Sequence, residues 1–197
     1  MPRTKAQFEE MRQATKEKIQ TAASYLFAQK GIAGTNVQEI ADRAGISIGL
    51  LYRHYKTKEE LFNDLVSTAR AGLTETTKRL SADGNPKDIL IAMTSEIIES
   101  YKKDDGFADN LIFITQALIS GLENEALNGL IEDDKKLIDA LTNLIERGQS
   151  EGVICGGTPR EIAFAYMSTV QGIGIFRNVM KSDFSVPSVE VLLSFLT

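Results

Sequence analysis

The sequence predicts an all-α fold of about nine helices. Apolar residues recur at the helical spacing i, i+3, i+4 and i+7 along most of the 197 residues, and no stretch has the alternation typical of a β-strand. Only four prolines occur, and most of the 15 glycines lie between the periodic runs. Apolar residues make up 43% of the chain and charged residues 25%, which is typical of a globular protein with a real core.

The first helix is expected from about residue 8 to residue 30, after a disordered start over residues 1–6. Its apolar stripe consists of Ile19, Ala22, Ala23, Leu26 and Phe27. Gly31 should end this helix, because glycine adopts the conformations that stop a helix at little steric cost. We expect this helix to carry and support the segment that follows it.

Two short helices joined by a tight turn come next. Asn36 and Glu39 form a capping-box pattern at the start of the first, and Gly45 should end it in the left-handed conformation. The apolar face of this helix consists of Val37, Ile40, Ala41 and Ala44. Ser47 is a candidate N-cap for a second helix that reaches about Tyr55. Two helices joined by a Gly-containing turn of about 3–4 residues form a helix-turn-helix, whose second helix can enter the major groove of DNA.

A fourth helix should begin at the capping-box pattern of Thr57 and Glu60 and run to about Leu80. It is long enough to connect the N-terminal part to the remainder of the chain. Residues 83–86 form the clearest loop. The later helices are expected over about residues 89–101, 107–121, 125–149, 158–180 and from 187 to the end.

Two of these later helices have distinctive patterns. The helix over residues 107–121 is apolar on most sides and should be central. The helix beginning at Thr158 combines a capping box, completed by Glu161, with Pro159 at the first helical position.

The charges are divided unevenly between two expected domains, residues 1–60 and 61–197. The first domain holds ten Lys and Arg against seven Asp and Glu, whereas the second holds twelve against twenty, so an overall charge of −5 conceals a mildly basic N-terminal part. A basic end on an acidic body suits a protein that meets phosphate at one end only. No flexible linker separates the domains, so the boundary should fall within or just before the fourth helix.

The helix-turn-helix segment carries a dense motif between Thr35 and Lys58. The motif consists of Ile40, Ala41, Ala44, Gly45, Ile46, Ser47, Gly49, Leu51, Tyr52, His54, Tyr55 and Lys58. In these positions the segment resembles the DNA-binding signature of the TetR family of bacterial transcriptional regulators. The resemblance covers about residues 12–65, and the remainder matches that family only in the number and length of its helices.

The second short helix presents several side chains suited to reading DNA. Ser47 can hydrogen-bond a base or a phosphate, Leu50 can contact a thymine methyl group, and Arg53 can reach a guanine edge or a phosphate. Gly49 lets the backbone approach DNA closely. Arg53 and Lys56 also fit an ordinary solvated helix face, so both interpretations stay open for them.

The resemblance implies further roles at this segment. It implies phosphate contacts for Thr35, Tyr52, His54 and Lys58, and it makes Leu51 and Tyr55 anchors to the core. Ile48 departs from the family pattern, in which many members have Lys or Arg. This departure removes one cationic contact and favours apolar contact with thymine.

The resemblance implies a symmetric dimer on a palindromic operator, with two helix-turn-helix units about 34–36 Å apart. The last two long helices would form the dimer interface, for which the candidates are Phe164, Val170, Ile173 and Phe176. It also implies a mostly apolar effector pocket for a small hydrophobic or amphipathic molecule. The candidate lining residues are Met93, Ile97, Tyr101, Phe113, Gln116, Tyr166 and Met167. For each of these residues an ordinary core position is the alternative.

The sequence disfavours other classes of function. With one His and one Cys it cannot build a metal site on those ligands, and it has no Gly-rich phosphate loop or nucleophile motif, so we expect no cofactor, no metal and no enzyme activity. Cys155 cannot form an intrachain disulfide. No apolar leader or membrane-length run occurs, so we expect a cytoplasmic regulator, more often a repressor than an activator. The alternatives are a helical adaptor of the same fold without DNA binding, or an activator without an effector.

Overall fold

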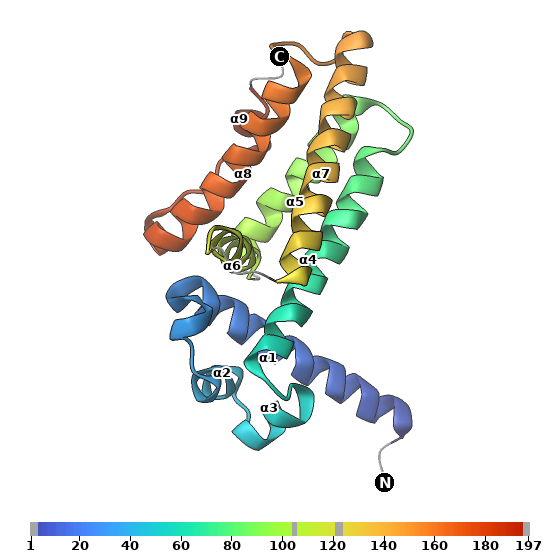
Figure 1. Cartoon of the computed structure of the whole chain (residues 1–197). Coiled ribbons are helices and arrows are strands. Elements are labelled where there is room, and N and C mark those ends of the chain that lie inside the picture. The colour runs from blue at the N-terminus through green and yellow to red at the C-terminus, as the bar shows by residue number, and fades with distance from the viewer. Residues whose placement is uncertain (1–3, 104–105, 121–123, 195–197) are drawn as a thin grey trace.

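The computed structural model describes residues 4–103, 106–120 and 124–194. Over these residues the chain forms nine α-helices and one short 3-10 helix and contains no β-strand, which confirms the predicted all-α fold (Figure 1). The helices are α1 Lys5–Gly34, α2 Val37–Ala44, α3 Ile48–His54, α4 Lys58–Leu80, α5 Pro86–Lys103, α6 Phe107–Ile119, α7 Glu125–Ser150, α8 Pro159–Met180 and α9 Val189–Leu192, with the 3-10 helix at Lys181–Asp183.

The first helix begins earlier than the sequence pattern indicated. Thr4 and Gln7 form a capping box, in which each side chain accepts a hydrogen bond from the backbone N–H of the other residue. The expectation of disorder over residues 1–6 is therefore wrong for residues 4–6, and residues 1–3 lie outside the described residues. Gly31 interrupts the helical path with a φ of 71°, as expected, and one further turn follows it.

Two of the predicted capping boxes differ from the pattern. Thr57 caps α4 by accepting the N–H of Glu60, but the Glu60 carboxylate accepts the N–H of Lys56 rather than that of Thr57. At α8 the Thr158 hydroxyl donates to the Glu161 carboxylate and caps no backbone N–H. The start of α8 therefore depends on Pro159, whose missing N–H needs no partner at a first helical position.

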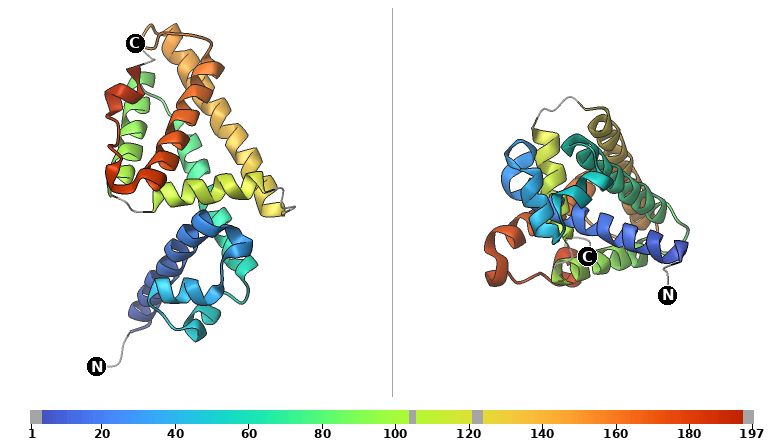
Figure 2. Two further views of the ribbon diagram at one scale, coloured as in Figure 1. Left: turned by 90° about the vertical axis from the view of Figure 1, so that its left-hand side faces the viewer. Right: turned by 90° about the horizontal axis from the view of Figure 1, so that it is seen from below.

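The molecule has two ends, which we call the head (α1–α3) and the body (α5–α9). The long helix α4 runs from the head into the body, where it lies alongside α7 (Figure 1). A view from the side has α6 lying across the molecule between the head and the rest of the body (Figure 2). The continuous helix α4 and the face that α6 presents to α1 connect the two ends. A hydrogen bond from the Gln29 amide of α1 to the Asn178 side chain of α8, at 2.9 Å, also joins them.

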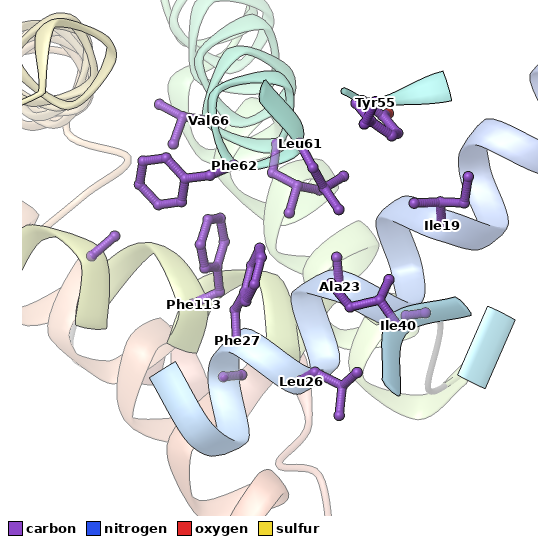
Figure 3. Close-up of a cluster of buried hydrophobic side chains, with 14 of the residues drawn as sticks. Ile19, Ala23, Leu26, Phe27, Ile40, Tyr55, Leu61, Phe62, Val66 and Phe113 are labelled. Carbon is purple, nitrogen blue, oxygen red and sulfur yellow. The ribbon is translucent and has the colours of Figure 1, made fainter. Parts of the chain in front are cut away.

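An aromatic cluster fills the junction between the two ends. The Phe113 ring of α6 lies 5.6 Å from the Phe27 ring of α1 and 5.5 Å from the Phe62 ring of α4, measured between centroids (Figure 3). All three side chains are at most 3% exposed, and they belong to one cluster with Leu127 and Leu130 of α7. The hydrophobic core of the head thus continues into the body across the expected domain boundary at residue 60, and the division into two domains stays a prediction.

An ion pair fixes α4 against α7. The Arg70 guanidinium donates to the Asp133 carboxylate at 2.7 Å, and Lys136 reaches the same carboxylate at 3.1 Å. The Arg70 group lies directly over Gly129, where a Cβ atom would come within 2.4 Å of it. Gly129 therefore provides the space in which the cation crosses from one helix to the other.

Candidate nucleic-acid interface

The helix-turn-helix is built by local signals. Asn36 and Glu39 form the predicted capping box at α2. Gly45 ends α2 at φ 67°, and the N–H groups of Gly45 and Ile46 bond back to the carbonyls of Asp42 and Ala41, a pattern that satisfies the free end of a helix. Both hydrogen bonds link the turn directly to the last residues of α2, which keeps the turn short.

The second helix, α3, begins as predicted at Ser47, whose hydroxyl accepts the N–H of Leu50. Leu51 and Tyr55 are buried at 2% and 4% exposure, so they anchor this helix to the core. The opposite side lies open to solvent and carries Ser47, Ile48, Gly49, Tyr52 and Arg53. Five of the predicted DNA-binding residues therefore lie together on one exposed face at the end of the molecule remote from the body (Figure 1).

Lys56 and Leu50 border this face. Lys56 is exposed, and its ammonium donates to the carbonyl oxygen of Tyr52 at 3.2 Å. Leu50 is only partly exposed. Both side chains therefore lie at the edge of the exposed face of α3.

The expectation that Thr35 contacts phosphate is wrong for its side chain. Thr35 is 3% exposed, and its hydroxyl donates to the carbonyl of Gly31 at 2.8 Å and also lies 3.2 Å from that of Leu26. The residue closes the end of α1. The resemblance identified its position in the motif, but only the tertiary structure reveals that its hydroxyl is used internally.

Lys58 is also largely committed inside the protein. Its ammonium donates to the carbonyls of Ile32 at 2.6 Å and Thr35 at 3.0 Å, and it ties the start of α4 to the end of α1. An ammonium has three donors, so one remains after these two bonds. Lys58 therefore fixes the turn that precedes α2, and a phosphate contact through its remaining donor stays a prediction.

His54 lies partly buried at the end of α3, in a hollow between α1 and the start of α4. The residues that line this hollow are Glu9, Arg12, Gln13, Lys16, His54, Tyr55, Glu60 and Asp64. Burial, followed by the nearby charges of Arg12 and Lys16, lowers the pKa of the His54 imidazole below its ordinary value of about 6.5. The ring is therefore neutral at pH 7 and offers one N–H donor. Its predicted phosphate contact would then be a neutral hydrogen bond.

The lowered pKa of His54 predicts a pH dependence of stability. The unfolded chain takes up a proton near pH 6.5, whereas the folded chain does so only at a lower pH, so folding stability should decrease as the pH falls below about 6.5. His54→Gln removes this contribution. Urea midpoints measured between pH 8 and pH 5.5 should fall further for the wild type than for the variant. Parallel decreases in the two proteins would contradict the assignment.

Sequence reasoning missed Asp64, a half-buried carboxylate on α4. It accepts hydrogen bonds from the Tyr55 hydroxyl at 2.6 Å, Gln20 at 2.8 Å and Lys16 at 3.0 Å. A single acidic residue in an amphipathic helix carries no local signal that three donors from elsewhere will meet it. Only the placement of α1 and α3 against α4 reveals this role.

The seven candidate effector residues do not gather around one cavity. Phe113 and Gln116 face α1: Phe113 is in the aromatic cluster, and Gln116 donates to the carbonyl of Ala28 at 2.9 Å. These contacts place the two residues at the junction with α1 and do not support a pocket role for them, which stays a prediction. Met167 lines an outer groove between α7 and α8. The other four, Met93, Ile97, Tyr101 and Tyr166, lie in or against the body core.

The four candidate dimer residues divide between two faces of α8. Val170 and Ile173 are 4% and 6% exposed and pack within the chain, so the prediction that they form the dimer interface is wrong. Phe164 and Phe176 are 50% and 59% exposed. Helical spacing shows which apolar residues share a face of a helix. It does not show which of two apolar faces a neighbouring helix covers.

The comparisons with known proteins agree with this geometry. The sequence model of a family described as "Bacterial regulatory proteins, tetR family" matches residues 19–65, which include α2, α3 and the buried residues that support them. Over these residues the chain is similar to the TetR family. Relatives that match more than three quarters of the chain are named as transcriptional repressors or regulators, which agrees with the prediction of a DNA-binding regulator rather than an enzyme.

Individual relatives extend the likeness along the chain. The chain is 32% identical to the transcriptional regulator AcrR of Shigella flexneri over 90 residues, which cover 45% of the chain and 42% of that regulator. It is 24% identical to the transcriptional repressor KstR2 of Rhodococcus jostii over 153 residues, 78% of the chain and 74% of the repressor. The fold matches that of AibR in complex with isovaleryl coenzyme A and operator DNA, with a TM-score of 0.66 and 22% identity over 91% of the chain and 94% of AibR.

Two further observations concern the residues that the structure describes. None of their helices combines the length and the apolar character that a membrane crossing requires. No group of three or more His, Cys, Asp or Glu side chains is arranged there to hold a metal ion.

Proposed function

We propose that the chain is a cytoplasmic, homodimeric transcriptional repressor that binds a palindromic operator through α3 and is released by a small hydrophobic or amphipathic ligand. The observation that carries the proposal is the open face of α3, from Ser47 to Arg53. A helix anchored by two buried side chains, with its other side free at one end of the molecule, has the form needed to enter a major groove. The likeness to KstR2, a named repressor, supports repression over activation.

The two kinds of exposed side chain on α3 should act differently. Tyr52→Ala should weaken binding to every duplex alike, by about fivefold, because it removes one neutral hydrogen bond to a phosphate that carries no sequence information. Leu50→Ala should instead change the preference at thymine positions, because it removes an apolar contact with the base methyl group. Affinities for a panel of single-base variants of one duplex measure both effects. Equal, sequence-independent losses from both variants would contradict this division.

The exposed apolar side of α8 supports a dimer. Phe164, Ile175, Phe176, Val179 and Met180 are each at least 45% exposed on this helix. The groove beside Phe164 continues onto α7, where Ile131 and Ile138 line it. A second copy of α7 and α8 would bury these side chains from water, and dimer formation would give the protein two α3 helices for a palindrome.

The body core supports a ligand with both apolar and polar parts. In its centre the Tyr166 hydroxyl and the Thr94 hydroxyl lie 3.0 Å apart, and both residues are at most 1% exposed. Met93 packs in the same cluster, and methionine side chains adapt to irregular shapes. A ligand that separates α5 from α8 would expose this polar pair as its anchor. It would favour release only if it binds the body of the free protein more tightly than that of the DNA-bound protein.

One experiment tests the DNA-binding proposal directly. The wild-type protein selects duplexes from a randomised library, and its affinity for the enriched duplex is measured between 50 and 200 mM salt. We expect enrichment of a palindrome and a loss of affinity of roughly 10³-fold over this range, because phosphate contacts release counterions. Failure to enrich any sequence, or a flat salt response, would favour a helical adaptor that has the fold without the DNA-binding function.

A further inference from the structure

The recognition helix α3 has few attachments to the rest of the head. It is seven residues long, and Leu51 is its only buried member, with Tyr55 buried immediately after it. In the described part of the chain, one side-chain hydrogen bond joins residues 47–55 to α1 or α4: the 2.6 Å bond from the Tyr55 hydroxyl to Asp64. The angle of α3 therefore depends on two apolar contacts and this bond.

Asp64 is itself held in a fixed position. Its Oδ1 atom accepts from Lys16 at 3.0 Å, and its Oδ2 atom accepts from both Gln20 and Tyr55. The donors come from α1 and from the residue that ends α3, whereas Asp64 is on the second turn of α4. The Asp64 side chain is 27% exposed, so its orientation comes from these partners more than from water.

The charge of Asp64 strengthens this arrangement. Burial acts to raise the pKa of the carboxyl, but the hydrogen bonds from Tyr55, Lys16 and Gln20 outweigh it and lower the pKa below its ordinary value. The group is therefore ionised at neutral pH. Hydrogen bonds to an ionised acceptor are shorter and stronger than those between neutral groups, in agreement with the 2.6 Å distance.

We propose that Asp64 is a positioning residue for DNA reading, through which α4 sets the angle of α3. Base discrimination requires that contacts in the major groove be held to within about half an ångström by supporting hydrogen bonds. Asp64 supplies that support without touching DNA. This inference rests on the proposed DNA-binding function.

The test compares how well variants distinguish two duplexes. Tyr55→Phe removes the hydroxyl and keeps the buried ring, whereas Asp64→Ala removes the acceptor. Tyr25→Phe is the matched control, because the Tyr25 hydroxyl has no hydrogen-bond partner among the described residues and its ring stacks under Arg43. For each protein, affinity is measured for the duplex that the wild type enriches and for a single-base variant of it, at a temperature at which circular dichroism finds every protein folded.

We expect Tyr55→Phe and Asp64→Ala each to lower the ratio of the two affinities by about fivefold, and the double variant to lose no more than either single variant. Tyr25→Phe should keep the wild-type ratio. A role in stability alone would lower the melting temperature and leave the ratio unchanged, which would overturn the proposal. Losses that multiply in the double variant would also overturn it, because Tyr55 and Asp64 would then act separately. If the wild type enriches no duplex, the proposed function itself fails.

Discussion

Replacing Phe113 with alanine should lower the free energy of unfolding by about 3–5 kcal/mol, the usual cost of removing a buried phenylalanine from a core. Phe113 is 1% exposed and lies between Phe27 of α1 and Phe62 of α4 (Figure 3). The substitution leaves a cavity where the head meets the body. Because three helices line that cavity, none of them can close it without moving away from another partner.

Urea denaturation of the purified variant measures this effect, and Ile119→Ala is the control. Ile119 is on the same helix but 79% exposed, so its truncation should change the free energy of unfolding by less than about 0.5 kcal/mol. If Phe113→Ala costs no more than Ile119→Ala, the aromatic cluster does not hold the two ends together. A second unfolding step in the Phe113 variant alone would indicate that the head then unfolds apart from the body.

Introducing a charge on the exposed side of α8 should have the largest effect on operator binding. Phe164→Glu would place a carboxylate in the proposed dimer interface, where burial of a charge is strongly unfavourable. We expect a monomer at micromolar concentration by analytical ultracentrifugation. Operator affinity should decrease by at least about 100-fold, which corresponds to roughly 2.7 kcal/mol, because a single α3 helix makes only half of the contacts.

The control for this prediction is Val191→Glu on α9. Val191 is 64% exposed and apolar, so this variant makes the same kind of change away from the proposed interface. It should remain a dimer and bind the operator as the wild type does. A dimeric Phe164→Glu protein with unchanged operator affinity would exclude this side of α8 as the interface.

Local features of the fold were the most predictable. The capping box of Asn36 and Glu39, the stop at Gly45 and the start at Ser47 all appear in the structure as expected. Each depends on residues at most five positions apart, so the local sequence contains everything that determines them. The exposed face of α3 follows from the same information, because the motif fixes which of its side chains must face inward.

Features that depend on how helices meet were less predictable. The apolar character of Phe113, Val170 and Ile173 indicated burial, but their spacing did not reveal which helix each would meet. The hydrogen-bond partners of polar residues were even less predictable. Thr35 and Lys58 occupy motif positions that suggested contact with DNA, yet backbone carbonyls at the end of α1 accept hydrogen bonds from both side chains.

The position of Phe113 has a consequence for protein engineering. A chimaera that joins residues 1–60 of this chain to the body of another regulator would replace the ring that fills the space beside Phe27. Such a hybrid should fold properly only if the transplanted unit also brings α6, or if the recipient offers a ring of similar size there. Modular exchange of specificity between such regulators would thus depend on a side chain more than fifty residues away from α3, the helix proposed to read the DNA.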